Sequence, residues 1–272
     1  MNGLVHDLRY AFRQLRKSPG FAFTSVLILA LGIGASAAIF GFVDAALIKP
    51  LPYKDPNRLI DVTESIAMMP RANLSYPDYL DWKRLNQVFS SMDVYNGSTY
   101  LLNTGSKTEL VPAVRVSDGF FRTLGVTPML GRDFYAGEDL PAAPRTAILT
   151  YATWQKRFGG RKNVTGETVT LTGIPYEIVG VLPPEFQFAP RGNVELFTAL
   201  HASDTCASRG CHALNGIGRL KDGVTVDMAR ANMETIARQL ELQYPNDNRG
   251  QGASVLPLAD AIVADIRPIL FV

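Results

Sequence analysis

Apolar residues near the start of the chain recur at helical spacing. They are Leu4, Leu8, Ala11, Phe12 and Leu15, and the cations Arg9, Arg13, Arg16 and Lys17 occupy positions between and after them. This pattern predicts an amphipathic helix that lies on a membrane surface with its cations toward anionic headgroups. A plain basic flank that only sets membrane topology is the alternative, and it explains the charges but not the apolar stripe.

A continuous apolar run follows from Phe21 to Val43. This stretch has 23 residues and no charge, and a helix of that length measures about 34 Å, enough to cross a hydrocarbon core of about 30 Å. Four Lys or Arg residues precede the run and Asp44 follows it. The positive-inside bias therefore predicts a transmembrane helix with the N-terminus in the cytoplasm and the rest of the chain outside.

Two other interpretations of this run are a cleaved signal peptide and a buried core helix. Ala35-Ser36-Ala37 has the small-residue pattern of a signal peptidase site, but the apolar run continues past it to Val43. A buried core helix is disfavoured because helices of soluble proteins keep a polar face. Gly34, Ala38 and Gly41 lie at three- to four-residue spacing, which would let another membrane helix approach closely. A lone anchor that is rich in glycine and alanine remains the alternative.

Shorter elements alternate after Asp44. Ser75 and Thr225 are expected as helix N-caps, and Gly125 is expected to end a short helix. Pro112 favours a position near a sheet edge. We expect an α+β fold of small βαβ-type units with a β-hairpin insert, Glu167–Gly173 and Tyr176–Leu182. The other expected strands are Arg58–Glu64, Leu110–Val116, Thr146–Thr150, Val194–Leu200, Gly216–Lys221 and Val255–Leu258, and the expected helices are Tyr76–Leu85, Asp118–Leu124, Tyr151–Phe158 and one from Thr225 to about Tyr244.

Composition changes this picture little. Of 272 residues 47% are hydrophobic, enough for one large domain or two small ones, and the net charge is +2. Residues 1–20 carry +3 and the remainder carries −1. The near-neutral body gives no reason to expect nucleic acid as a partner.

The sequence contains no familiar catalytic motif. A phosphate-binding GxxxxGK[ST] loop, HExxH and GxSxG are all missing from it, so we expect no catalytic residue, no cofactor and no metal site. The acidic pairs Asp78-Asp81 and Glu138-Asp139 are interpreted as solvated faces or helix caps. Six aromatic residues are expected in the core rather than in a ligand platform: Trp82, Phe89, Phe120, Phe121, Trp154 and Phe158.

Cys206 and Cys211 are the only cysteines. In an oxidising compartment they predict one local disulfide, with free thiols as the alternative. His201 and His212 lie close by in the sequence, but the spacing of the four residues fits no common zinc pattern.

Several blocks of the sequence, taken in order, resemble one family. The first block is LRYAFRQLRKSPGFAFTSVLILALGIGASAAIF, which resembles the opening of MacB/FtsX-type ABC transporter permeases. Later blocks resemble that family's periplasmic core domain, in the branch of orphan permeases that duplicate permease and core domain without an attached ATPase. These blocks are LGVTPMLGRDF, AILTYATWQKRFGG, NVTGETVTLTGIPYEIVGVLPPEFQF and GRLKDGVTVDMARANMETIARQLELQYP.

The resemblance implies a permease component of an ABC transporter in the bacterial inner membrane. A cytoplasmic ATPase would be its partner, the permease would pair or form a homodimer, and an extracytoplasmic partner protein could be driven. The expected organisation is a cytoplasmic helix at 1–20, a transmembrane helix at 21–43, a MacB-like periplasmic core domain at 44–266, and the start of a second transmembrane helix at 267–272. An ordinary apolar strand is the alternative for this last segment.

Two other functions are alternatives for the whole chain. A single-span adaptor or binding module would act through its outer domain only. An anchored enzyme has only unplaced carboxylates in its favour.

Overall fold

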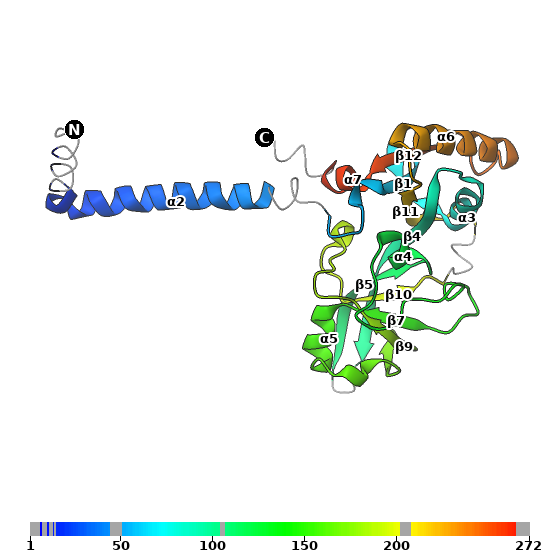
Figure 1. Cartoon of the computed structure of the whole chain (residues 1–272), viewed down its shortest axis with the longest axis horizontal. Helices are drawn as coiled ribbons and strands as arrows, with labels where there is room; N and C mark the ends of the chain where they lie inside the picture. Colours follow the sequence, from blue (N-terminus) through cyan, green and yellow to red (C-terminus); the bar gives the residue numbers. More distant parts are fainter. Residues whose placement is uncertain are drawn as a thin grey trace. The chain divides into compact units, whose positions relative to one another are not determined.

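The computed structural model describes His6, Tyr10, Arg13 and residues 15–43, 51–103, 107–201 and 208–264, without the side chains of 38–40, 42 and 43 (Figure 1). The chain divides into two compact units, Met1–Lys49 and Pro50–Val272. The first unit contains the long helix α2, Pro19–Val43. The expected second membrane helix at 267–272 lies outside the described residues.

The second unit, called the body here, is built on one mixed sheet of twelve strands. Its main path runs β12-β1-β11-β4-β5-β10-β7-β9-β6, with β2 on β1, β3 on β11, and β8 between β4 and β9. The strands are β1 Leu59–Ile66, β2 Met69–Ala72, β3 Leu74–Ser75, β4 Phe89–Asn103, β5 Thr108–Val116, β6 Leu130–Gly131, β7 Thr146–Leu149, β8 Thr168–Leu171, β9 Ile174–Val181, β10 Leu196–Ala199, β11 His212–Leu220 and β12 Gly252–Pro257.

Helices cover this sheet at several places. Helices α3 and α6 lie at one end of the body, and α5 lies at the other (Figure 1). Their bounds are α3 Tyr76–Leu85, α4 Phe120–Leu124, α5 Tyr151–Phe158, α6 Val226–Gln243 and α7 Leu258–Ala264, with 3-10 turns at Pro56–Arg58, Lys162–Val164 and Ala189–Arg191. The predicted mixed α and β architecture is confirmed.

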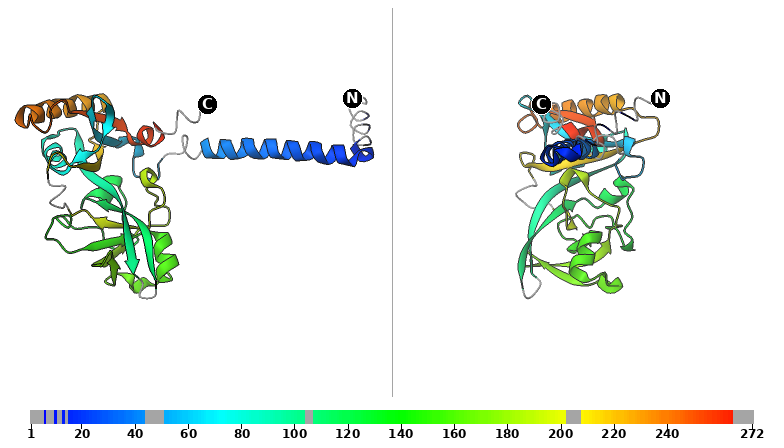
Figure 2. Two further views of the ribbon diagram at one scale, coloured as in Figure 1. Left: turned by 180° about the vertical axis from the view of Figure 1, so that it is seen from behind. Right: turned by 90° about the vertical axis from the view of Figure 1, so that its left-hand side faces the viewer.

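The longest strand, β4, joins the two ends of the body. Its first half, from Phe89 to Tyr95, pairs with β11, and its second half, from Tyr95 to Asn103, pairs with β5. Figure 2 shows this strand running from the α6 end to the α5 end. Its sequence is FSSMDVYNGSTYLLN, in which Asn96-Gly97 resembles a turn, and no strand is predicted there.

Three apolar clusters form the core. One packs α3 and α6 against the β1, β4 and β11 region, through residues such as Trp82 and Met233. A second contains the aromatic side chains of α4 with Phe197, and the third lies under α5 around Trp154. Of the six aromatic residues expected in the core, five are buried and Phe158 is partly buried against the third cluster.

Local capping signals placed the helices well. The side chains of Ser75, Thr150 and Thr225 each accept a hydrogen bond from a backbone N–H of the first helical turn, at Asp78, Thr153 and Met228 respectively. Gly125 ends α4 with φ 72°, a conformation that glycine adopts without steric cost. The bounds predicted for α3 and α5 agree with the structure, because these signals are local in the sequence.

Two details of the prediction were wrong. Strand β5, which contains Pro112, lies between β4 and β10 and is not an edge strand. Pro112 is tolerated there because it directly precedes Ala113, the first residue of β5 that pairs with β10. The carbonyl of Pro112 accepts a hydrogen bond from the N–H of Glu195. The predicted hairpin leaves Ile174 and Pro175 in the turn, but both residues already pair with β8. The turn falls instead on Thr172 and Gly173, at φ 50° and 81°.

Candidate functional site

Helix α2 has the composition of a membrane span. The stretch Pro19–Ala37 has a mean hydropathy of 1.9 and no buried residue. A Cβ placed at Gly34 or Gly41 would meet no atom within 4 Å in the part of the chain that the structure describes. These positions can therefore accept a neighbouring helix, and their predicted packing role, together with Ala38, stays a prediction.

The predicted cytoplasmic cations are described only in part. Arg13, Arg16 and Lys17 have helical backbone and exposed side chains, whereas Arg9 lies outside the described residues. An interfacial role of these four residues stays a prediction.

In the body, Arg209 forms the densest ionic contact. One of its nitrogens lies 2.5 Å from a carboxylate oxygen of Asp78, and another pairs with Asp81. Its guanidinium carbon lies 3.6 Å from the centre of the Tyr244 ring, and Asn248 donates to the same oxygen of Asp78 at 2.9 Å.

Asp78 is 1% exposed, and the hydroxyl of the N-cap residue Ser75 donates to its carboxylate. The predicted helix cap is therefore confirmed for Asp78, and the predicted solvated face is wrong. The Asp78 carboxylate thus connects α3 with Arg209 and Asn248, which lie 131 and 170 positions later in the sequence.

A second buried acid lies on β1. Glu64 is 1% exposed; one of its oxygens accepts from the N–H of Ser75 at 3.1 Å, and the other lies 2.8 Å from Nδ1 of His212. Burial raises the pKa of this carboxyl to about 8, and the Ser75 N–H opposes the rise. The acid therefore carries a proton at neutral pH. No local pattern in the sequence marks Glu64, because its partners come from β3 and β11.

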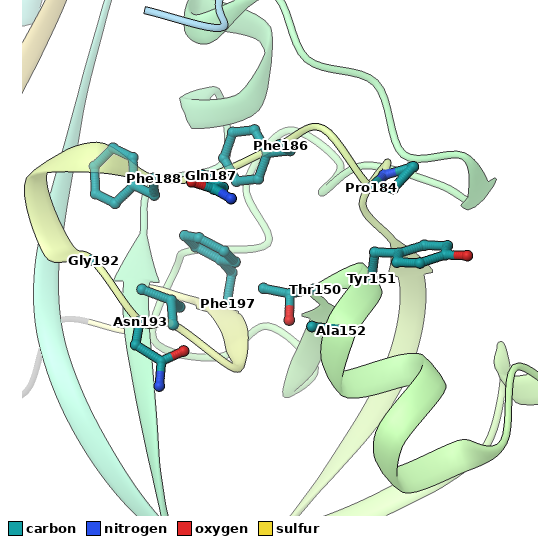
Figure 3. Close-up of a pocket in the computed structure, with 11 residues that line it drawn as sticks. Thr150, Tyr151, Ala152, Pro184, Phe186, Gln187, Phe188, Gly192, Asn193 and Phe197 are labelled. Atoms are coloured by element: carbon teal, nitrogen blue, oxygen red, sulfur yellow. The ribbon is translucent and has the colours of Figure 1, made fainter. Parts of the chain in front are cut away.

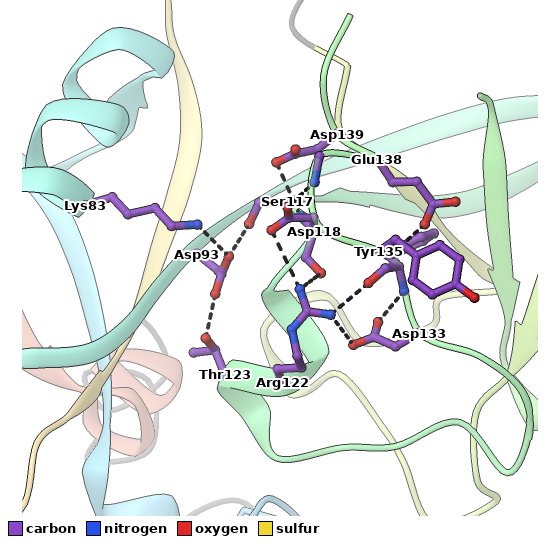
Figure 4. A network of polar contacts seen from close by, with 12 residues as sticks. Lys83, Asp93, Ser117, Asp118, Arg122, Thr123, Asp133, Tyr135, Glu138 and Asp139 are labelled. Carbon is purple, nitrogen blue, oxygen red and sulfur yellow. Dashed lines mark hydrogen bonds and ion pairs between the residues drawn. The ribbon is translucent and has the colours of Figure 1, made fainter. Parts of the chain in front are cut away.

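The third polar group is a network around Asp93 of β4 (Figure 4). Ser117 donates to one oxygen at 2.8 Å, Thr123 of α4 donates to the other at 2.5 Å, and Nζ of Lys83 lies 3.4 Å away. Burial lowers the pKa of Lys83, but Asp93 and Tyr79 outweigh it and the net pKa is raised. The network ties α3, β4 and α4 together where the α6 half of the body meets the aromatic cluster.

Arginines hold the loop that follows α4. Arg122 pairs with Asp133 at 3.1 Å, and burial raises the pKa of Asp133 to about 6. Arg132 binds Glu138 through two contacts of 2.8 Å.

Glu138 and Asp139 are 7% and 8% exposed, so the prediction of a solvated acidic pair is wrong here too. Glu138 has its partners, Arg132 and the Tyr135 N–H, within six residues along the loop. Asp139 instead accepts from the more distant N–H of Asp118.

A hollow opens beside the aromatic cluster (Figure 3). It has a volume of about 360 Å³ and is bounded by the start of α5 and the segment before β10. Phe186, Phe188 and Phe197 form its buried floor, and Phe188 and Phe197 stack edge to face, 6.2 Å apart. The described residues that line it carry no formal charge. The floor of the hollow is part of the aromatic core cluster, so we assign the hollow no chemical role.

The structure describes Cys211, His201 and His212 but not Cys206, so it tests the cysteine and histidine predictions only in part. Cys206 lies outside the described residues, so its disulfide with Cys211 stays a prediction. Within the described ranges no three His, Cys, Asp or Glu residues are grouped to hold a metal ion. His201 is buried after β10, and burial lowers its pKa, with Arg145 adding to the effect. His212 lies instead against Glu64.

The comparison with protein families decides the identity of the body. Residues 22–236 match the family described as MacB-like periplasmic core domain. The chain belongs to this family. A comparison with curated protein sequences finds no significant match.

Solved structures share the fold of this MacB-like domain. The periplasmic region of MacB from Actinobacillus actinomycetemcomitans aligns with a TM-score of 0.56 at 14% identity, over 78% of this chain and 94% of that one. A domain of a putative permease protein from Porphyromonas gingivalis gives 0.58 at 12% identity, over 76% and 93%. The extracellular domain of the noncanonic ABC-type transporter YknZ from Gram-positive bacteria gives 0.51 at 15% identity, over 73% and 99%.

Family membership and the apolar helix together describe the setting of the site. A MacB-like periplasmic core domain next to an N-terminal apolar helix implies a membrane-anchored protein whose folded body lies outside the cytoplasm. The similar structures are a periplasmic region of MacB, a domain of a putative permease protein and an extracellular domain of an ABC-type transporter.

Proposed function

We propose that the chain is a permease component of an ABC transporter, which couples ATP hydrolysis by a partner ATPase to movement of its extracytoplasmic body. One observation carries the proposal: an apolar helix long enough to cross a bilayer precedes a MacB-like periplasmic core domain in the same chain. The movement would serve efflux or would drive an extracytoplasmic partner protein.

The polar contacts of the body support its use as a single moving part. Arg209, Asp93 and Glu64 each join elements that are far apart in the sequence, and the carboxylates they involve are almost fully buried. Breaking such contacts exposes or isolates buried charge, which is costly. A pull on the α6 half of the body would thus move that half as a unit instead of unfolding it locally.

The proposed assembly needs contacts on the first unit. The basic segment would lie at the cytoplasmic membrane surface, where the positive-inside bias places it, and would approach the ATPase. The face with Gly34 and Gly41 would pack on other membrane helices of the complex, either in a homodimer or in a paired permease.

Co-purification from native membranes tests the partner. A tagged chain should recover an ATP-binding subunit, and the charge reversals Arg16→Glu and Lys17→Glu should reduce that recovery severalfold. Arg230→Glu is the matched control, because Arg230 is a partly exposed cation on α6 of the body. Failure to recover any ATP-binding subunit from native membranes, with the body intact, would sink the proposal and favour the single-span adaptor.

A topology measurement separates the orientation from the partner. A reporter that is active only in the cytoplasm should work when fused before residue 1, and a reporter active only outside should work when inserted after Met68, which is 92% exposed in the β1–β2 turn. The reverse pattern would contradict the proposed orientation.

A further inference from the structure

A cavity of about 400 Å³ is bounded by the turn Ala189–Arg191, by α7 and by strands β1, β2, β4 and β11. Its size lies within the range for small-molecule sites. Apolar lining residues come from the turn and from α7, among them Pro190, Ala261 and Ile262. The polar lining residues are Asp61, Arg71, Tyr95, Arg191 and Asn215. The cavity thus offers both a charged and an apolar surface to one ligand.

The exposed side chain of Arg191 supplies a cation to this cavity. Its guanidinium carbon lies 5.7 Å from the centre of the Tyr95 ring. A Cβ on Gly97 of β4 would stand 3.0 Å from one guanidinium nitrogen, so the missing side chain at Gly97 leaves room for the guanidinium beside the strand. Within the described residues this guanidinium makes no ion pair and no hydrogen bond. Its charge is therefore available to a ligand.

The turn that carries Arg191 is fixed from below. The hydroxyl of Tyr53 donates to the carbonyl of Gln187 at 2.9 Å and accepts from the N–H of Ala189 at 3.2 Å. Phe188 is 2% exposed in the aromatic core cluster, and its carbonyl accepts from the N–H of Arg191 at 3.0 Å. The backbone therefore holds the cation in place before a ligand arrives, which reduces the entropy cost of binding.

The other charged residues leave the accessible charge of the cavity positive. Arg71 and Asp61 lie 3.2 Å apart as an ion pair, in which the arginine side chain is 30% exposed and the aspartate side chain 5%. Two arginines against one aspartate give the lining residues a net charge of +1. An anion is therefore the ligand that this charge favours.

The Tyr95 hydroxyl adds a hydrogen-bond donor. It makes no hydrogen bond to any described residue, and burial raises its pKa, with a smaller rise from Asp61 and opposing effects of Arg191 and Arg71. The hydroxyl therefore keeps its proton at neutral pH and can donate it to an anion.

Two simpler interpretations explain only part of this arrangement. A purely structural Arg191 would contribute its contact with the Tyr95 ring, but a cation–π contact uses none of the five N–H donors of a guanidinium. A site for a free phosphate ion would use the cation but not the apolar residues of the turn and α7. Guanidinium donors beside apolar residues match a carboxylate on an apolar body.

We propose that this cavity binds a carboxylate attached to an apolar body. The carboxylate pairs with Arg191 and accepts from the Tyr95 hydroxyl. The apolar body lies against Pro190, Ala261 and Ile262. The ligand is either a free organic acid or the C-terminal residue of a protein partner. The site requires no partner ATPase, so its test is independent of the proposed transport function.

The experiment is calorimetric titration of the full chain in maltoside micelles with sodium hexanoate at pH 7.5, after subtraction of the same titration into protein-free micelles. We expect saturable binding of one hexanoate per chain. n-Hexanol, which lacks the charge, should bind at least about tenfold more weakly. Inorganic phosphate, which lacks the apolar body, should also bind at least about tenfold more weakly.

Three substitutions make this test specific. Arg191→Gln removes the charge and should weaken hexanoate binding at least about tenfold. Gly97→Ala keeps the charge but displaces the guanidinium, and it should weaken binding severalfold. Arg238→Gln is the matched control, because Arg238 is exposed on α6, and it should bind as the unmodified chain does. Thermal unfolding midpoints show that the variants are folded.

The remaining arm distinguishes the two sources of the ligand. Tighter binding of acetyl-Gly-Leu with a free carboxylate than of hexanoate identifies a protein C-terminus, and equal or weaker binding identifies a free acid. Three results would overturn the proposal. They are the lack of saturable binding at millimolar hexanoate, unchanged affinity in Arg191→Gln or Gly97→Ala, and equal or higher affinity for n-hexanol or phosphate.

Discussion

The guanidinium of Arg209 lies over the ring of Tyr244, 3.6 Å from its centre, while its nitrogens pair with two aspartates of α3. The side chain is 13% exposed, so both the stacking and the ion pairs form largely out of water. This contact links α3, the end of α6 and the segment that leads into β11.

Removing Arg209 should therefore destabilise the body strongly. Arg209→Ala leaves a buried carboxylate at Asp78 without its cation, and we expect a loss of about 3 kcal/mol in the free energy of unfolding. Urea denaturation of the full chain in detergent, followed by tryptophan fluorescence, measures the change. Arg230→Ala is the control, because its pair with Asp227 is mainly exposed, and its effect should stay within about 0.5 kcal/mol. Equal effects of the two substitutions would contradict this account of Arg209.

Glu64 should make stability depend on pH in a defined direction. Its pKa is raised from 4.5 to about 8 in the folded state, so between these values the folded state binds more protons than the unfolded state. The free energy of unfolding must then fall as pH rises from about 4.5 to about 8, by up to about 1.4 kcal/mol per pH unit. Glu64→Gln removes this contribution.

The difference between the two proteins isolates the contribution of Glu64. Denaturation at pH 5.5 and pH 8.5 should show Glu64→Gln gaining stability relative to the unmodified chain as the pH rises. A difference that is constant across this range would show that the acid is not buried as described.

Gly119 should tolerate no side chain. A Cβ at this position would lie 2.7 Å from both carboxylate oxygens of Asp93, which Ser117 and Thr123 hold in place. Gly119→Ala is expected to cost about 1–3 kcal/mol of stability. Gly210→Ala is the control, because a Cβ there would meet no described atom within 4 Å. Thermal unfolding of both variants checks the contrast, and an unchanged midpoint for Gly119→Ala would disprove the rigidity of the Asp93 network.

Local signals explain which elements could be predicted from the sequence. Helices α3, α5 and α6 were found because their caps and apolar stripes lie within the elements themselves. Strand β4 was missed because its stability comes from ladders with β5 and with the distant β11. Gly97 illustrates the difficulty: it resembles a turn residue, yet it lies in the strand, where a Cβ would stand only 3.0 Å from the Arg191 side chain.

The polar contacts of the body were harder to predict for the same reason. Asp78 and Arg209 are 131 positions apart, and no periodicity or motif connects them. An acid on a helix surface and an acid paired with a buried arginine look the same in a sequence. Only the arrangement of β1, β3 and β11 brings Glu64 beside His212.

Gly34 should matter for assembly but not for the fold of the body. A Cβ there meets no atom within the described chain, so Gly34→Leu should leave the unfolding of the body unchanged. It should reduce the recovery of other membrane helices of the complex severalfold, because a large side chain blocks close helix packing. Ile33→Leu, a volume-conserving change at an exposed neighbouring position, is the control. Equal recovery with Gly34→Leu would favour a lone anchor.

Energy transfer across the membrane surface tests the central claim most directly. Leu242 is 85% exposed at the end of α6, and a donor dye on a cysteine placed there, in a background with Cys206→Ser and Cys211→Ser, would report distance to acceptor lipids in a nanodisc with the partner ATPase. We expect the transfer efficiency to change on addition of ATP and to stay constant with an ATPase variant that cannot hydrolyse it. An efficiency that stays the same while the bound ATPase hydrolyses ATP would contradict the proposed coupling.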